Sequence, residues 1–134
     1  MKKCDILIID DDDEDVEILS DAFKKIGLDK MHYEQSAEKA LIYLKGLQNS
    51  EDLPKIIITD YYLSGSTGVD FIKLLKGLDA FKHIPVIVLS MQRTEKEIQK
   101  FIEMGAADYL VKPSTYDDYL KLVGIIKAKI VVQA

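Results

Sequence analysis

Residues 6–15 read ILIIDDDDED, four apolar residues followed without a break by six acidic ones. A short, continuous apolar run is typical of a strand that is buried on both faces, and such strands belong to parallel sheets. In open α/β sheets, ligands bind just beyond the carboxyl ends of the strands. The acidic residues therefore stand where a cation or a phosphate would be held.

Three more short runs lead into residues with useful chemistry. Residues 56–59 read IIIT and lead to Asp60, and residues 86–89 read VIVL and lead to Ser90. The third run, Tyr109-Leu110-Val111, leads into Lys112-Pro113. If these runs are parallel strands, their polar ends gather at one edge of the sheet.

The composition limits what the chain can be. At 134 residues, of which 48% are hydrophobic, it is expected to form one domain with a sizeable core, over residues 1–134 and without an effector domain. A net charge of -5 argues against a nucleic-acid partner. The single cysteine, Cys4, excludes an internal disulfide and fits a reducing compartment. No apolar run is long enough to span a membrane, so we expect a cytoplasmic protein.

Short β-rich runs alternate with helical patterns along the whole chain. We expect strands near residues 5–10, 31–35, 55–60, 85–90 and 108–111, with a polar connection over residues 46–54. Five helices are expected between and after them, and their inward residues are Val16, Leu19, Phe23 and Ile26; Ala37, Ala40, Leu41 and Leu44; Phe71, Ile72, Leu75 and Leu78; Ile98 and Ile102; and Leu120, Val123, Ile126 and Ile130.

Capping signals support three of these helices. Thr67 and Asp70 have a spacing like that of a capping box, Thr94 and Glu97 form a full one, and Thr115 precedes the last helix. Five βα units result, and right-handed crossovers place helices on both faces of the sheet. The predicted fold is therefore α/β, a doubly wound (βα)5 three-layer sandwich with a central five-stranded parallel sheet.

The acids at two strand ends form a candidate metal site. Asp10, Asp11 and Asp60 converge if the first and third strands are neighbours, and their like charges would repel each other. Oxygen ligands suit Mg²⁺, which commonly binds one or two carboxylates together with a phosphate oxygen. A carboxylate can also attack a phosphoryl group to form an aspartyl-phosphate. Asp60 is the candidate nucleophile because it stands alone at the end of the central strand.

Two other strand ends complete the candidate site. Pro113 favours an extended conformation at Lys112, which would project the ammonium group from the strand tip toward a phosphate or carboxylate. Ser90 adds a hydroxyl group at a neighbouring strand end. Each residue taken singly also has an ordinary structural explanation. In particular, acids such as Asp12, Asp13 and Glu14 favour the positive end of a helix.

At these residues the chain resembles the receiver domain of two-component response regulators, over essentially its whole length. The matching motifs are residues 8–12, IIDDD; residues 58–60, ITD, with Gly68 eight residues on; residues 85–90, PVIVLS; and residues 105–113, GAADYLVKP. The resemblance implies a flavodoxin-like (CheY-like) fold with strand order 2-1-3-4-5.

The resemblance also implies a role for each matching residue. Asp60 corresponds to the phosphoacceptor. Asp11 corresponds to a direct Mg²⁺ ligand, Asp10 to one that acts largely through water, and the backbone carbonyl of Tyr62 to a further ligand; Mn²⁺ is an alternative ion. Ser90 corresponds to a switch hydroxyl, Tyr109 to an aromatic ring that swings inward behind it, and Lys112 to the partner of a phosphoryl oxygen.

The chain departs from the family pattern at three positions. Ser64 replaces a usual proline, Met91 replaces a usual small residue, and Ser114 replaces a frequent phenylalanine. A bulky Met91 is expected to crowd the phosphoryl group or slow its entry. The resemblance also implies that Tyr62, Met91 and Gln92 occupy positions whose side chains can influence access to the site or hydrolysis.

The implied function is signalling rather than enzymatic turnover. The expected phosphoryl donor is a sensor histidine kinase or a histidine phosphotransfer protein. The expected output is a change of the face made by the fourth helix, the fifth strand and the fifth helix, read by a protein target, a phosphorelay acceptor or a second copy of the chain after activation. Two alternatives remain at this point: an Mg²⁺-dependent phosphohydrolase with an Asp nucleophile, and a pseudo-receiver scaffold that is never phosphorylated.

Overall fold

A computed structural model describes residues 4–47, 49–63, 66–91 and 94–133 of the chain. Strands and helices alternate along these residues, as the sequence predicts. In chain order the elements are β1 (Ile6–Ile9), α1 (Asp13–Lys25), β2 (Met31–Glu34), α2 (Ala37–Lys45), the 3-10 helix η1 (Ser50–Asp52), β3 (Ile56–Asp60), β4 (Tyr62–Leu63), β5 (Ser66–Thr67), α3 (Gly68–Lys76), β6 (Val86–Ser90), α4 (Glu95–Glu103), β7 (Asp108–Val111) and α5 (Tyr116–Gln133).

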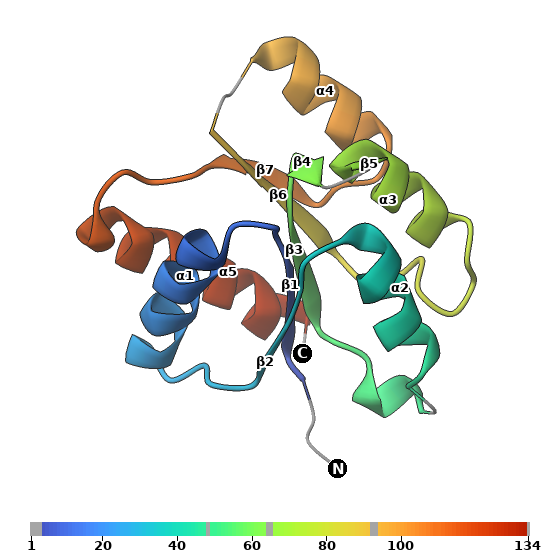
Figure 1. Ribbon diagram of the computed structural model, residues 1–134, viewed down its shortest axis with the longest axis horizontal. Coiled ribbons are helices and arrows are strands. Elements are labelled where there is room, and N and C mark those ends of the chain that lie inside the picture. Colours follow the sequence, from blue (N-terminus) through green and yellow to red (C-terminus); the bar gives the residue numbers. More distant parts are fainter. Residues whose placement is uncertain (1–3, 48, 64–65, 92–93, 134) are drawn as a thin grey trace.

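Five strands form one parallel sheet in the order β2-β1-β3-β6-β7 (Figure 1). Counted along the chain without the two short strands β4 and β5, this is the order 2-1-3-4-5 that the family resemblance implies. The central strands β1 and β6 are buried along their whole length, and β3 is buried up to its last residue. Burial on both faces explains why these strands read as continuous apolar runs.

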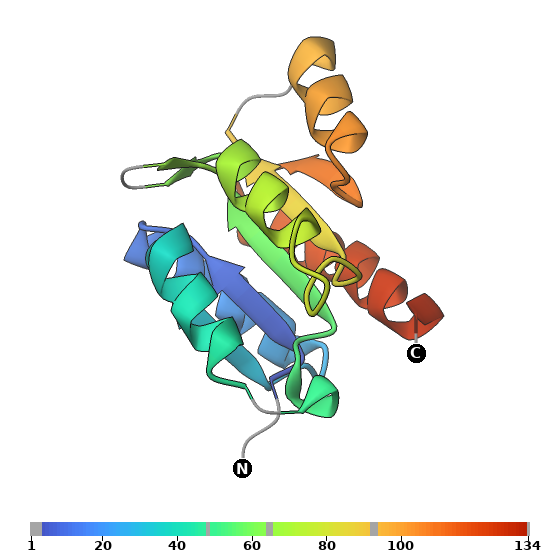
Figure 2. The same cartoon turned by 90° about the vertical axis from the view of Figure 1, so that its right-hand side faces the viewer.

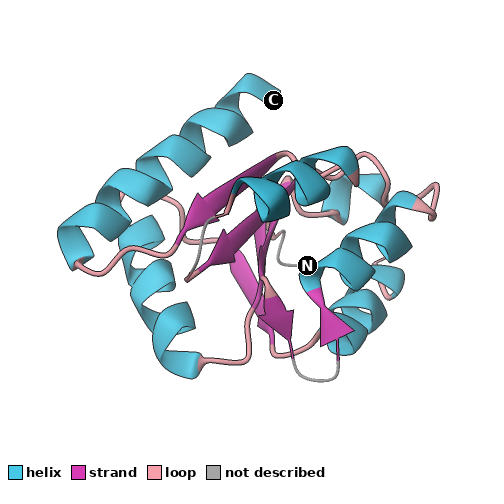
Figure 3. Ribbon diagram, turned by 90° about the horizontal axis from the view of Figure 1, so that it is seen from above, coloured by secondary structure: helices cyan, strands magenta, loops and turns pink. Residues whose placement is uncertain are grey.

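Helices cover both faces of the sheet (Figures 1 and 3). Leu7 and Ile9 of β1 pack with α2, α3 and α4 in one apolar cluster, while Ile6 and Ile8 pack with α1 and α5 in the other. Figure 2 shows α2 and α3 on one side of the sheet and α5 on the other. The predicted three-layer α/β sandwich is confirmed.

The inward face of α4 differs from the prediction. Ile102 is 46% exposed and Ile98 is only partly buried, whereas Phe101 is fully buried between the helix and the sheet. On a helix, residues three apart share a face and adjacent residues are about 100° apart. Because Phe101 faces the sheet, Ile102 lies on the flank of a helix that is only nine residues long.

Other helices follow the prediction more closely. Val16, Leu19 and Phe23 of α1 are buried, and Ile26 is partly buried just beyond its end. Thr94 and Thr115 cap α4 and α5 as predicted, because the Glu97 N–H donates to Thr94 Oγ1 at 3.2 Å and the Asp118 N–H donates to Thr115 Oγ1 at 3.1 Å. The carboxylate of Glu97, the other half of the predicted capping box, accepts from the Tyr109 hydroxyl.

Two small elements were not predicted from the sequence. The antiparallel hairpin β4–β5 follows β3, and η1 lies within the polar connection over residues 46–54. Strands of two residues and a single helical turn are too short to leave a periodic pattern. Within the described residues, no helix is both long enough and apolar enough to cross a membrane.

We predict opposite effects from alanine at two glycines. Gly105 ends α4 with φ of +108°, and a Cβ there would lie 3.0 Å from Lys76 Cε. Gly105→Ala should therefore lower the free energy of unfolding by about 1–3 kcal/mol. Gly124 lies within α5 with nothing within 4 Å of an added Cβ, so Gly124→Ala should raise it by about 0.5–1 kcal/mol. Urea denaturation of both variants measures these changes; equal effects would contradict the structure.

Candidate functional site

The polar ends of four parallel strands meet at one edge of the sheet, where the sequence places its candidate residues. Asp10 directly follows β1, Asp60 ends β3, Ser90 ends β6, and Lys112 directly follows β7. These strands are consecutive neighbours in the sheet. The backbone N–H of Lys112 donates to the carbonyl of Ser90 at 2.8 Å, which fixes the start of the lysine side chain beside β6.

Asp10, Asp11 and Asp60 converge at this edge. Each offers one carboxylate oxygen, and these oxygens lie within 4.8 Å of one another. Asp10 is only 6% exposed, Asp60 is partly buried, and Asp11 is exposed to solvent. The predicted cluster therefore forms from two strand ends that are 50 residues apart in the chain.

The environment disfavours negative charge on the two less exposed acids. Burial, together with the neighbouring charge of Asp10, raises the pKa of Asp60 to about 6, although Lys112 and the Tyr61 N–H act in the opposite direction. Burial also raises the pKa of Asp10, against the effects of the Asp12 N–H and Lys112. A compensating positive charge would remove this penalty.

Lys112 supplies one such charge inside the cluster. Its Nζ lies 2.8 Å from Asp15 Oδ2, 3.0 Å from Asp10 Oδ2 and 3.4 Å from Asp60 Oδ2, and its side chain is only 5% exposed. Burial lowers the pKa of Lys112, but the hydrogen bond to Asp15 and the charges of Asp10 and Asp60 outweigh burial and raise it overall. The lysine is therefore a permanent cation at this site.

The rest of the acidic run serves the start of α1. Asp12 is the N-cap residue, and its Oδ1 accepts from the N–H groups of Glu14 at 3.0 Å and Asp15 at 3.4 Å. Asp13 Oδ1 accepts from the Tyr33 hydroxyl at 2.8 Å. Asp12, Asp13 and Glu14 therefore lie at the positive end of a helix, which is the ordinary structural role expected for such acids.

Ser90 and Tyr109 connect the strand ends to α4. Both are buried, at 3% and 1% exposure. The Tyr109 hydroxyl donates to Glu97 Oε2 at 3.1 Å and accepts from the Ser90 hydroxyl. The Tyr109 ring also packs against Phe101 at a centroid distance of 5.4 Å. Tyr109 therefore lies inward, with its hydroxyl linked to a carboxylate of α4.

Of the three candidate access residues, the structure describes the side chain of Met91. Met91 is 76% exposed, so its side chain projects into solvent. Tyr62 begins β4, two residues after Asp60, and its carbonyl group stays a predicted metal ligand. Gln92 and Ser64 lie outside the described residues. Ser114 is exposed between β7 and α5.

Sequence reasoning missed two residues that contact the site. Asp15 binds Lys112 across 97 residues of chain, a separation that leaves no local pattern. The sequence indicates Glu97 only as a capping residue of α4, whereas in the structure its carboxylate accepts a hydrogen bond from the Tyr109 hydroxyl. The common signal in both cases is an acid in the first turn of a helix that follows a strand end of the candidate site.

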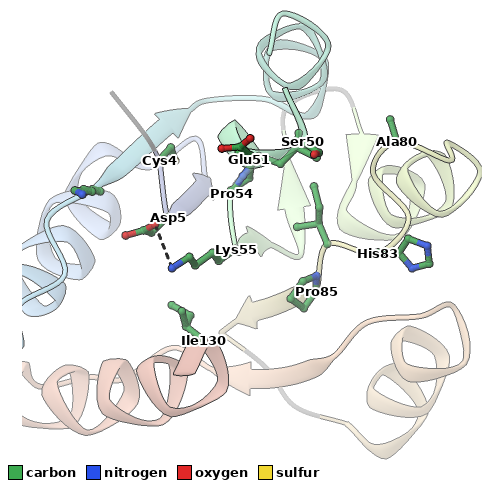
Figure 4. Close-up of a pocket in the computed structure, with 13 residues that line it drawn as sticks. Cys4, Asp5, Ser50, Glu51, Pro54, Lys55, Ala80, His83, Pro85 and Ile130 are labelled. Atoms are coloured by element: carbon green, nitrogen blue, oxygen red, sulfur yellow. Dashed lines mark ion pairs between the residues drawn. The ribbon is translucent and has the colours of Figure 1, made fainter. Parts of the chain in front are cut away.

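A cavity of about 630 Å³ lies at the amino-terminal ends of the strands, opposite the candidate site (Figure 4). It is lined by residues before β1, β3 and β6, and Asp5 and Lys55 face each other across 3.9 Å at its wall. None of the candidate site residues lines it. The cluster of carboxylates and the cavity are therefore separate features at opposite ends of the strands.

Comparison with known proteins agrees with this geometry. The family profile of the response regulator receiver domain matches residues 6–124. The two-component response regulator ARR7 of Arabidopsis thaliana is 31% identical over 127 residues, which cover 90% of this chain and 61% of that protein. This chain therefore belongs to the response regulator receiver domain family, and it spans less than two thirds of the length of ARR7.

Solved structures share the fold. A two-component response regulator from Legionella pneumophila is 32% identical with a TM-score of 0.77, and the match covers 94% of this chain and 99% of that one. The Mn²⁺-bound form of response regulator Rcp1 is 24% identical with a TM-score of 0.78, covering 92% and 91%. Neither alternative from the sequence, the phosphohydrolase or the pseudo-receiver, is favoured by these matches.

The first prediction from the site concerns stability and pH. The raised pKa of Asp60 means that its proton is held more tightly in the folded state, so folding stability falls as pH rises from 3.8 to about 6. Without divalent cations, Asp60→Asn should therefore raise the free energy of unfolding by about 1–3 kcal/mol near neutral pH. Below the ordinary pKa of aspartate the difference should vanish.

Urea denaturation at neutral and acidic pH measures this effect. Asp21→Asn, at an exposed position of α1, is the matched control for loss of one negative charge. A destabilised Asp60→Asn protein at neutral pH would contradict the electrostatic penalty at this site.

The second prediction concerns the contact between α4 and Tyr109. Glu97→Ala should lower the free energy of unfolding by about 1–2 kcal/mol, because the buried Tyr109 hydroxyl loses a charged acceptor. Glu95→Ala, an exposed acid in the same helical turn, controls for the helix dipole. In a Tyr109→Phe background, the effect of Glu97→Ala should shrink to that of Glu95→Ala. An undiminished effect would show that the contact contributes nothing.

Proposed function

We propose that this receiver domain accepts a phosphoryl group on Asp60 from a phosphohistidine of a sensor histidine kinase or a histidine phosphotransfer protein. The observation that carries the proposal is the convergence of Asp10, Asp11 and Asp60 with the ammonium group of Lys112 at one edge of the sheet. Carboxylates alone would suit a cation, and a lysine alone would suit an anion. Together they suit a phosphoryl group that arrives with a metal ion.

Asp10, Asp11 and Asp60 are suitable ligands for a divalent cation. Three hard carboxylate oxygens lie close together, and burial, which raises the pKa of Asp10 and of Asp60, makes their ionised forms costly without a nearby positive charge. Asp10, Asp11 and Asp60, with the carbonyl of Tyr62, would hold Mg²⁺, and Mn²⁺ is an alternative. When bound, the ion would supply positive charge that stabilises the transferring phosphoryl group.

Transfer to Asp60 replaces one bond to phosphorus with another. A carboxylate oxygen of Asp60 attacks phosphorus, and a phosphorus–oxygen bond forms. The phosphorus–nitrogen bond of the donor breaks, and its electron pair leaves with the imidazole. Lys112 is close enough to Asp60 for its ammonium group to donate to a phosphoryl oxygen, and Ser90 offers a hydroxyl donor from the neighbouring strand.

The signal would then pass to α4 through Tyr109. Drawing the Ser90 hydroxyl toward the phosphoryl group would break its bond to Tyr109, which in turn binds Glu97 of α4. A changed surface made of α4, β7 and α5 would reach a protein target, a phosphorelay acceptor or a second copy of the chain. We propose that this occurs in the cytoplasm, without nucleic acid or membrane, consistent with the net charge of -5 and the single cysteine.

The test is phosphorylation by a small-molecule donor. Incubation with acetyl phosphate and Mg²⁺ should add one phosphoryl group to the wild-type protein, as measured by intact mass. Asp60→Asn should abolish this gain, because it removes the nucleophile, whereas Asp21→Asn should leave it unchanged. Beryllofluoride should shift the NMR signals of Ser90, Tyr109 and α4 in the wild type. A mass gain that survives Asp60→Asn would overturn the proposal.

A further inference from the structure

The shortest contact of the site lysine is with an acid outside the proposed metal ligands. Lys112 Nζ is 2.8 Å from Asp15 Oδ2, against 3.0 Å for Asp10 and 3.4 Å for Asp60. Asp15 comes from α1 and not from a strand end. Its side chain is 29% exposed, so the carboxylate is only partly shielded from solvent.

Lys112 contacts two of the carboxylates that a divalent cation would use. The two are Asp10 and Asp60, which its ammonium group contacts. A cation that enters the cluster must therefore displace or share these contacts, and it is repelled by the ammonium charge at close range. Whatever fixes the position of Lys112 thus helps to set the affinity of the site for the ion.

We propose that Asp15 is a positioning residue for Lys112: it holds the ammonium group on the α1 side of the site, so that oxygens of Asp10 and Asp60 stay available to a divalent cation. This inference rests on the proposed function and extends it to a residue of α1. Asp15 acts through Lys112 and touches neither the ion nor the phosphoryl group.

Local structure holds Asp15 in the necessary place. The Asp12 cap accepts its N–H at 3.4 Å and so fixes the first turn of α1. Side chains on a helix tilt toward its N-terminus, and for Asp15 this direction leads back to the strand ends. On the other side, the backbone of Lys112 is tied to Ser90 and precedes Pro113. With both backbones fixed, the ion pair has little freedom to move.

The general attraction of acids to a helix N-terminus does not account for this contact. Glu14 lies in the same turn, carries the same charge and is exposed, whereas the carboxylate of Asp15 meets a buried ammonium group. Glu14→Gln therefore removes one charge from the same region without touching the ion pair. It is the matched control for Asp15→Asn.

The experiment is an Mg²⁺ titration of the unphosphorylated protein, followed by NMR or calorimetry. Asp15→Asn should weaken Mg²⁺ binding about three- to tenfold, and more than Glu14→Gln does. Asp15→Glu, which keeps the carboxylate, should restore most of the affinity. Circular dichroism and urea denaturation check that each variant is folded, and Asp15→Ser serves as a second neutral variant if Asp15→Asn does not fold.

A double-mutant cycle with Lys112→Met separates positioning from simple charge attraction. Without the ammonium group, Asp15→Asn should weaken Mg²⁺ binding no more than Glu14→Gln does. An equal effect of Asp15→Asn in both backgrounds would overturn the positioning role. If the wild type binds no Mg²⁺, both this inference and the proposed metal site fail. If it binds Mg²⁺ and is phosphorylated on Asp60 while Asp15→Asn behaves as the wild type, only the role of Asp15 fails.

Discussion

The attraction between one buried ammonium group and several carboxylates is the constraint on which the site depends. Asp10 and Asp60 lie at neighbouring strand ends because the sheet order places β1 beside β3. Their charges would repel each other without a cation between them. Lys112 provides that cation in the described structure. It follows the edge strand β7 and contacts Asp10 and Asp60 at the ends of the inner strands β1 and β3.

This arrangement is held by the core rather than by the site itself. The raised pKa of Asp60 indicates that its ionised carboxylate opposes folding. The two apolar clusters on the faces of the sheet stabilise the fold and keep the strand ends together. Any positive charge that neutralised these carboxylates would relieve this penalty.

Two helices on opposite faces of the sheet contact residues near the carboxyl ends of the strands. Asp15 of α1 binds Lys112, and Glu97 of α4 binds Tyr109, which is linked to Ser90. Both acids lie in the first turn of their helix, close to the carboxyl ends of the strands. Both helices are therefore tied by a side-chain contact to a residue in or next to a strand end.

The sequence by itself determined the parallel sheet, the helix caps and the strand ends that carry Asp10, Asp60, Ser90 and Lys112, because local periodicity and turn chemistry leave clear patterns. For α4 it identified Ile98 correctly but placed Ile102 inward where Phe101 is, because a nine-residue helix with three apolar residues has more than one apolar face and packing against the sheet selects one. Only the tertiary structure decided that Asp15 meets Lys112 and Glu97 meets Tyr109. The first contact joins residues 97 positions apart and the second joins residues 12 positions apart, and the geometry of both is set by how helices pack on the sheet.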